Sequence, residues 1–334
     1  MLDMPIWLAF IVLIIGFIIL IKGADIFVSG ASNIAHFLGV STLVIGLTVV
    51  AFGTSLPETA VSISAQIFGL DDVSLGNVIG SNIFNLLPIL GISALIYPLI
   101  VKKDIIKRDL PVSIGATLLL ILMFFFFSYH NKKAITRYEG IILISFLIIY
   151  LIYIVRKSLR ETEALQEYNR LNNIPAEENV TTLSKKKAII YTIIGLISVT
   201  GGGILVTEGA KEVALFFGMS EWLVGLTIVS LGTSLPELIT SLTAAYKKEV
   251  DIAVGNVVGS NFFNLLFILG SAALIKPLTF NSAALFDLIF LAAASLIVLL
   301  LVLRKKTIGK LEGSIMILMS LGYFTYIIVR EIAF

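Results

Sequence analysis

Long apolar stretches separated by short polar turns fill almost the whole chain. They are rich in Leu and Ile and lack the strict alternation of apolar and polar residues that marks a half-buried strand, so the pattern predicts helices. About 20 apolar residues in a helix cross about 30 Å of hydrocarbon. We therefore expect ten transmembrane helices, over residues 5–29, 43–68, 74–97, 111–128, 139–156, 187–213, 222–246, 253–275, 284–303 and 312–330.

The composition also places the chain in a membrane. Hydrophobic residues make up 58% of its 334 residues and charged residues 14%, whereas soluble domains are about 45–50% apolar and about 25% charged. The net charge of +2 gives no reason to expect a nucleic-acid partner. The absence of cysteine excludes disulfides and thiolate metal sites, and two histidines are too few for a zinc centre. The expected fold class is an all-α membrane protein.

The basic residues of the predicted loops indicate the orientation. Once Lys22 inside the first span is set aside, 17 of the remaining 23 Lys and Arg residues follow spans 1, 3, 5, 7 and 9. Positive residues stay in the cytoplasm, so we expect the N and C termini to be extracellular. Residues 157–186 form the longest hydrophilic stretch. We expect a cytoplasmic linker there, because few domains of fewer than about 40 residues are stable.

The chain contains an internal duplication. Residues 46–99 align without a gap with residues 225–278, at a constant offset of 179, and 31 of the 54 positions are identical. Both copies contain GTSLPE and GNV-x-GSN. An odd number of spans separates the copies, so the second enters the bilayer from the opposite side. This predicts two inverted-topology five-helix repeats, over residues 1–156 and 187–334, with a substrate site near the midplane as in many secondary transporters.

An acidic residue lies near the middle of one span in each copy. These residues are Glu58 and Glu237. A charged side chain at the centre of a membrane costs about 3 kcal/mol on insertion scales, and neither motif helix has Lys or Arg near its centre. We expect a bound cation to supply the missing positive charge. A pair of neutral, protonated carboxyl groups is the alternative.

Oxygen-bearing groups surround both glutamates in the sequence. The proline of each GTSLPE motif has no N–H, which frees the backbone carbonyl four residues earlier. A continuous helix would place Ser55, Glu58 and Ser62 on one face. The hydroxyl and carboxamide side chains of the two motifs are Thr54, Ser55, Ser81 and Asn85 in the first copy and Thr233, Ser234, Ser260 and Asn264 in the second.

This set of donors indicates a hard cation. Carboxylate, amide, hydroxyl and carbonyl oxygens suit Ca²⁺ and suit Na⁺ equally, but they suit zinc and copper poorly. Two negative charges can balance one Ca²⁺ or hold a few Na⁺ ions, and competition of two ions for the same oxygens is the physical basis of antiport. No Walker sequence is present, so we expect an ion gradient to supply the energy and expect no enzymatic activity.

The duplicated motifs resemble the alpha-repeats of the calcium/cation antiporter superfamily, and within it the chain looks like a prokaryotic sodium/calcium exchanger. The resemblance implies exchange of several Na⁺ for one Ca²⁺ and sliding of spans 1 and 6 against a rigid core. By motif position it implies a metal-ligand set of Glu58, Glu237, Thr54, Thr233, Ser55, Ser234, Ser81, Ser260, Asn85 and Asn264, with the backbone carbonyls of Ala51 and Ser230.

Two departures from family patterns refine this picture. Some relatives, notably potassium-dependent exchangers, have Asp where this chain has Asn264, which argues against K⁺ co-transport. Proton/calcium members show a GNxxE pattern, whereas this chain has Gly80 and Gly259 there. The resemblance implies Na⁺ and Ca²⁺ as substrates, no cofactor, and a monomeric transport unit in a prokaryotic plasma (inner) membrane.

Other functions stay open from the sequence. An H⁺/Ca²⁺ or other cation/proton exchanger could use the same two glutamates, because a buried carboxyl can carry a proton. A cation channel would more naturally be an oligomeric ring, and a membrane scaffold would have no reason to place two acids at mid-membrane. Ion flux under defined gradients distinguishes these alternatives.

Overall fold

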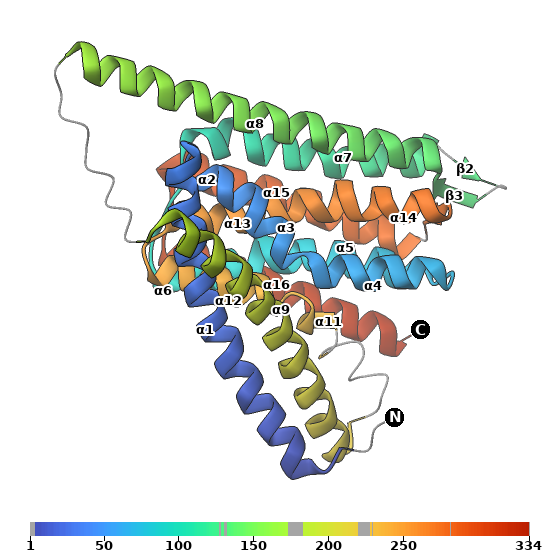
Figure 1. Ribbon diagram of the computed structural model, residues 1–334. Coiled ribbons are helices and arrows are strands. Elements are labelled where there is room, and N and C mark those ends of the chain that lie inside the picture. Colours follow the sequence, from blue (N-terminus) through green and yellow to red (C-terminus); the bar gives the residue numbers. More distant parts are fainter. Residues whose placement is uncertain are drawn as a thin grey trace.

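The computed structural model describes residues 4–126, 128–129, 132–172, 183–219, 228, 230–280 and 282–333. Apart from the connecting turns and strands of two to four residues, these residues are helical (Figure 1), which confirms the expected all-helical fold. The first half comprises α1 (Ile6–Leu38), α2 (Thr42–Ile45), the π-helical segment η1 (Gly46–Val50), α3 (Ala51–Thr54), α4 (Leu56–Ile67), α5 (Asp71–Phe84), the π-helical η2 (Asn85–Ile89), α6 (Leu90–Ile96), the π-helical η3 (Ile105–Asp109), α7 (Leu110–Phe126) and α8 (Arg137–Leu171).

The second half repeats much of this order. It comprises α9 (Lys185–Phe216), α11 (Ser230–Gly232), α12 (Leu235–Tyr246), α13 (Val250–Phe262), the π-helical η5 (Phe263–Ile268), α14 (Leu269–Ile275), α15 (Ser282–Lys305) and α16 (Lys310–Ala333). Short antiparallel strands tie helix ends together: β1 (Leu99–Ile100) pairs with β5 (Thr307–Ile308), and β3 (Lys132–Ile135) pairs with β2 (Ser128–Tyr129) and β4 (Leu278–Thr279). The strands β1 and β5 join segments from the two halves.

Eight helices in the described part of the chain are long and apolar enough to cross a membrane. The segments 42–54 and 56–67, bent by 48° relative to each other, make a ninth when they are taken as one span. The expected span over residues 222–246 includes residues 222–227 and 229, which lie outside the described residues. The count of ten spans therefore stays a prediction.

Helix α8 is longer than the sequence pattern predicts. The expected span ends at residue 156, but the helix continues to Leu171 and takes in half of the predicted linker. Residues 157–171 contain neither Gly nor Pro, and Lys157 pairs with Glu161 one turn later at 3.5 Å. Good helix formers and an i,i+4 ion pair keep a polar segment helical, so hydrophobicity alone places the helix end too early.

Helices α1 and α9 run antiparallel, side by side, along one flank of the molecule (Figure 1). Glycines at seven-residue spacing line their contact: a Cβ added at Gly23 would lie 2.6 Å from the Cβ of Ser198, and one added at Gly202 would lie 2.6 Å from the backbone N of Leu20. Small residues let membrane helices approach closely. The glycines that face the partner helix are Gly16, Gly23 and Gly30 on α1 and Gly195, Gly202 and Gly209 on α9.

The duplicated motif helices lie at the centre of the molecule. A Cβ added at Gly259 of α13 would lie 2.7 Å from the carbonyl O of Leu47 in η1, and one added at Gly255 would lie 2.9 Å from the carbonyl O of Leu43 in α2. The first copy's span thus packs against the second copy's span with little side-chain material between them. This close approach brings polar groups of both halves together in the core.

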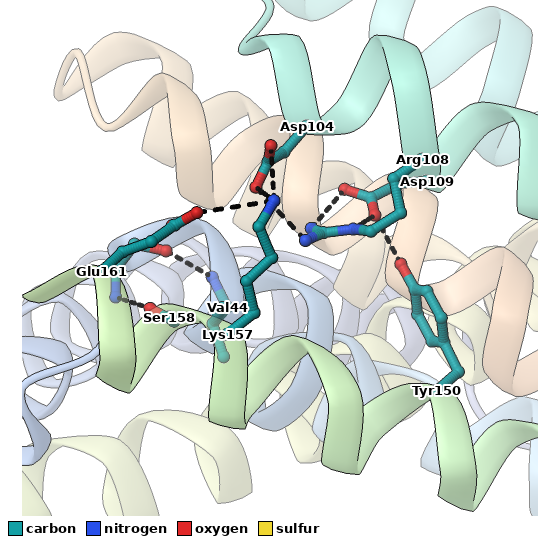
Figure 2. A network of polar contacts seen from close by, with 9 residues as sticks. Val44, Asp104, Arg108, Asp109, Tyr150, Lys157, Ser158 and Glu161 are labelled. Carbon is teal, nitrogen blue, oxygen red and sulfur yellow. Dashed lines mark hydrogen bonds and ion pairs between the residues drawn. The ribbon is translucent and has the colours of Figure 1, made fainter.

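A second polar cluster lies away from this centre and joins η3 to α8 (Figure 2). The carboxylate of Asp109 is fully buried. It lies 2.5 Å from Nε of Arg108 and accepts a hydrogen bond of 2.6 Å from the hydroxyl of Tyr150. Asp104 accepts from Arg108 at 3.2 Å and pairs with Lys157 at 2.9 Å. These contacts between opposite charges anchor α8 to η3.

Candidate functional site

The two central glutamates each follow a break in their helix. Glu58 lies in the first turn of α4 and Glu237 in the first turn of α12, each directly after a proline. The residues at the breaks leave helical geometry, with φ −81° and ψ 9° at Ser55 and φ −88° and ψ 5° at Ser234. Proline at the start of a helix needs no N–H partner, and the free N–H groups of a helix N-terminus favour negative charge. The motif therefore places each acid at an electropositive helix start.

Each glutamate is held by a serine from the other half of the chain. The Ser55 hydroxyl donates to Oε1 of Glu237 at 2.9 Å, and the Ser234 hydroxyl donates to Oε1 of Glu58 at 2.9 Å. Both carboxylates are completely buried. The two halves thus meet around the acid pair, with matching contacts that follow the sequence duplication.

The predicted face of Ser55, Glu58 and Ser62 forms only in part, because Glu58 and Ser62 lie within α4 whereas Ser55 precedes it. The helix breaks at Ser55, so this residue turns away from α4 and reaches Glu237 in the other half. Ser62 accepts a hydrogen bond of 2.8 Å from Nδ2 of Asn77 instead. The i,i+3,i+7 rule assumes a continuous helix, and the break required by the proline invalidates that assumption.

Further predicted residues extend the same site. Since the Ser234 proton goes to Glu58, the Ser81 hydroxyl, 3.1 Å away, is the donor of the bond between Ser81 and Ser234, and the Ser260 hydroxyl lies 3.5 Å from both Oε1 of Glu237 and the carbonyl O of Ala51. Thus both copies of the second motif contribute hydroxyls to the acid pair. The predicted position Ser230 begins α11, and its side chain lies outside the described residues.

Several polar atoms of the site have no hydrogen-bond partner. These buried atoms are Oε2 of Glu58, Oε2 of Glu237 and both amide atoms of Asn85 and Asn264. Among the described residues, neither glutamate forms an ion pair with Lys or Arg. Buried polar atoms are normally satisfied, so this cluster of unsatisfied oxygens is the chemistry expected where a cation binds.

Asn85 and Asn264 lie in π-helical turns, which the sequence pattern did not predict. Asn85 begins η2 and Asn264 lies in η5. Single π-helical turns within α-helices are frequent at functional sites. Both asparagines are completely buried and follow the Ser81 and Ser260 positions by one turn.

Sequence reasoning missed Asn77 and Asn256 as members of this region. Thr54 donates to Oδ1 of Asn256 at 3.1 Å, and Thr233 donates to Oδ1 of Asn77 at 3.4 Å. The available signal was an asparagine retained in both copies of GNV within an apolar helix. The asparagines of the GSN segments, Asn82 and Asn261, have a different role. Nδ2 of Asn82 donates to the backbone carbonyl of Val78 at 2.8 Å, and Nδ2 of Asn261 donates to the backbone carbonyl of Asn82 at 3.3 Å.

The described residues contain no group of three or more His, Cys, Asp or Glu side chains that could hold a metal. A cation at the acid pair would therefore be coordinated mainly by neutral oxygens.

Comparisons with known proteins show which family the chain resembles. The model of the family described as sodium/calcium exchanger protein matches residues 8–156 and 187–329. The chain is 37% identical to the putative antiporter CaxA of Alkalimonas amylolytica over 88% of this chain and 90% of that protein. It is 32% identical to the sodium/calcium exchanger MaX1 of Methanosarcina acetivorans, covering 94% of this chain and 97% of that protein.

A solved structure is also similar over the full length. The sodium-calcium exchanger NCX_Mj, soaked without Na⁺ and Ca²⁺, superposes with a TM-score of 0.81 at 31% identity, covering 97% of this chain and 100% of that chain. The same exchanger soaked with Na⁺ and Ca²⁺ gives a TM-score of 0.78 at 32% identity. The similarity in fold therefore extends to both halves.

Proposed function

The chain belongs to the sodium/calcium exchanger protein family, and from this premise we propose that it is a secondary active antiporter that exchanges Na⁺ for Ca²⁺. The coarser activity, cation/Ca²⁺ antiport, is that of the family. The finer assignment of Na⁺ as the driving ion is our own. It is supported by the absence of the GNxxE pattern, since Gly80 and Gly259 occupy those positions.

One observation carries the proposal: two fully buried carboxylates share a site with no basic partner among the described residues. A buried charge needs a partner of opposite sign, and a divalent cation matches two carboxylates. Ca²⁺ takes 6–8 oxygen ligands in flexible geometry. The proposed ligands are Glu58, Glu237, Thr54, Thr233, Ser55, Ser234, Ser81, Ser260, Asn85 and Asn264, with the carbonyls of Ala51 and Ser230.

Competition for these oxygens would couple the two ions. Two carboxylates neutralise one Ca²⁺ or partly balance several Na⁺ ions, but electrostatic repulsion opposes simultaneous occupancy by both loads. A site that holds either load and then changes the side to which it opens performs exchange. The energy comes from the Na⁺ gradient, and no cofactor is needed.

The duplicated architecture supplies the alternation of access. We propose ten spans as two inverted five-helix repeats, residues 1–156 and 187–334, joined by a cytoplasmic linker, with extracellular termini. In this scheme the pair α1 and α9 slides as a unit against the motif helices. The glycine contacts that hold α1 to α9 along their length support a rigid pair. The monomer would be the transporting unit, in a prokaryotic plasma membrane.

Calcium uptake into liposomes tests this function. Protein is reconstituted into liposomes loaded with Na⁺, and Ca²⁺ uptake is followed after dilution into Na⁺-free medium. We expect uptake that requires the outward Na⁺ gradient and responds to membrane potential, because several Na⁺ ions would move against one Ca²⁺. Protein-free liposomes and liposomes without internal Na⁺ are the controls.

The other outcomes identify the alternatives. Uptake driven by a pH gradient in the absence of Na⁺ would replace Na⁺ with H⁺ as the driving ion. Uptake that follows the Ca²⁺ gradient alone, with no counter-ion, would indicate a channel. Either result would overturn the sodium assignment.

A further inference from the structure

Asn77 of α5 and Asn256 of α13 occupy equivalent positions of the duplication, and neither is among the proposed ion ligands. Each makes three hydrogen bonds at the edge of the acid pair. Asn256 is completely buried, while Asn77 is partly exposed. A carboxamide has two N–H donors and one oxygen acceptor, and here both kinds of group are used.

The amide nitrogens fix the glutamates of their own half. Nδ2 of Asn77 donates to the backbone carbonyl of Glu58 at 3.1 Å, and Nδ2 of Asn256 donates to that of Glu237 at 3.3 Å. A second bond from each nitrogen reaches a serine one turn later, Ser62 at 2.8 Å or Ser241 at 2.9 Å. A backbone carbonyl only accepts, so the nitrogen must face it and the amide oxygen must point the other way.

The amide oxygens contact the opposite half. Oδ1 of Asn256 is the nearer acceptor of the Thr54 hydroxyl at 3.1 Å, with the carbonyl O of Ala51 at 3.3 Å, and Oδ1 of Asn77 accepts from the Thr233 hydroxyl at 3.4 Å. Thr54 and Thr233 are proposed ligands. A hydroxyl has one proton, so when that proton is given to the amide oxygen, the lone pairs of the hydroxyl are left for a cation. Partners behind the ligands orient them in this way at metal sites generally.

We propose that Asn77 and Asn256 are positioning residues for ion binding, each of which orients the threonine ligand of the opposite half while it fixes the glutamate of its own half. This inference rests on the proposed function. Each asparagine then links the two halves at the place where ligands from both halves would coordinate a bound ion. The pairs are specific: Asn256 acts through Thr54, and Asn77 acts through Thr233.

Crossed double-mutant cycles test this pairing. Ca²⁺ binding to the purified full-length protein in Na⁺-free detergent solution is measured by titration calorimetry for Asn256→Ala, Thr54→Val and the double variant, and for the mirror set Asn77→Ala and Thr233→Val. We expect each asparagine variant to bind Ca²⁺ about 10-fold to 100-fold more weakly, the usual cost of losing a partner behind a metal ligand. Buried Asn256, with the shorter bond, should show the larger loss.

The mismatched combinations are the matched controls. The effect of Asn256→Ala should shrink by at least about threefold in the Thr54→Val background, because contacting residues couple, and it should be unchanged in the Thr233→Val background. The reverse holds for Asn77→Ala. A purely structural role would weaken binding alike in both backgrounds. If Asn256→Ala does not fold, the cycle at the partly exposed Asn77 tests the same pairing.

The outcomes separate this inference from the proposed function. Equal effects in matched and mismatched backgrounds, or asparagine variants that bind Ca²⁺ as the wild type does, would overturn the positioning role and leave the exchanger assignment intact. A wild-type protein that binds no Ca²⁺ would overturn the proposed function and this inference with it.

Discussion

The hydroxyl of Ser55 lies 2.9 Å from Oε1 of Glu237, although the two residues are 182 positions apart in the sequence. Glu58, only three positions away from Ser55, receives its matching hydrogen bond from Ser234. The exchange of partners means that neither carboxylate is held by the serine of its own GTSLPE motif. Any movement of one half relative to the other must alter the surroundings of both acids.

Neutralising either acid should abolish exchange. Glu58→Gln and Glu237→Gln keep the size of the side chain but remove one of the two charges that balance Ca²⁺, so Na⁺-driven Ca²⁺ uptake in liposomes should fall to the level of empty vesicles. The control is Glu208→Gln, since Glu208 is about half-exposed on α9 and pairs only within its helix at 3.5 Å. Full activity in either variant would reject a site shared by both glutamates.

Adding a third carboxylate should change ion preference. Asn264→Asp places an acid where both amide atoms are buried without a partner. The extra negative charge favours a divalent ion over a monovalent one, so we expect the ratio of the KM values for Na⁺ and Ca²⁺ to shift by about tenfold, which corresponds to about 1.4 kcal/mol. The exposed Asn172→Asp at the end of α8 is the control. An unchanged ratio would mean that Asn264 does not touch the ions.

The packing of α1 against α9 should be sensitive to a single methyl group. A Cβ at Gly202 would lie 2.6 Å from the backbone N of Leu20, whereas one at Gly201 has nothing within 4 Å. Overpacking usually costs about 1–3 kcal/mol, so Gly202→Ala should lower the melting temperature in detergent and Gly201→Ala should not. Equal melting temperatures would show that the two helices can separate without cost.

The cluster around Asp109 should contribute to stability rather than to transport. Tyr150→Phe removes the 2.6 Å hydrogen bond to the buried carboxylate but keeps the ring, whose centroid lies 4.6 Å from that of Phe262. Hydrogen bonds to charged groups contribute about 1.5–3 kcal/mol, and the free energy of unfolding should fall by that amount. Tyr153→Phe, at an exposed position on the same helix, is the control. Equilibrium unfolding in mixed micelles measures both variants.

A contact between α1 and the end of α12 should affect mobility more than stability. Nζ of Lys247 lies 2.8 Å from Oδ1 of Asp25 and donates to Oγ of Ser29 at 2.6 Å. Because exposed ion pairs contribute less than about 1 kcal/mol, Lys247→Met should leave the melting temperature nearly unchanged.

The same variant should loosen α1 locally. Hydrogen exchange of residues 25–38 should become faster in Lys247→Met, because the only change is the loss of an anchor between α1 and the core. Lys211→Met, which removes a pair internal to α9, is the control and should leave that segment unaffected. Identical exchange in all three proteins would mean that this contact does not restrain α1.

The sequence predicted which chemical groups form the site better than it predicted which of them contact each other. Two duplicated acids without basic neighbours identify the central pair, and the hydroxyls of Ser81 and Ser260 lie close to it. The prediction that Ser55 shares a helix face with Glu58 and Ser62 was wrong, because the helix break before the proline turns Ser55 toward the other half. The supporting contacts of Asn77 and Asn256 were not predicted, since nothing local distinguishes a packing asparagine from one that orients a ligand.

By itself the sequence determined that the chain is a bundle of membrane helices, that its two halves share one origin, and that an acid pair must be neutralised within the bundle. These conclusions depend on the composition, on the spacing of apolar residues, and on the constant offset between the two copies of the duplicated segment. All three are properties of the linear sequence. Only the tertiary structure decided which serine serves which glutamate, which asparagine faces which threonine, and where α8 ends. Helical geometry relates residues up to about four positions apart, and contacts across 182 positions depend on how helices pack.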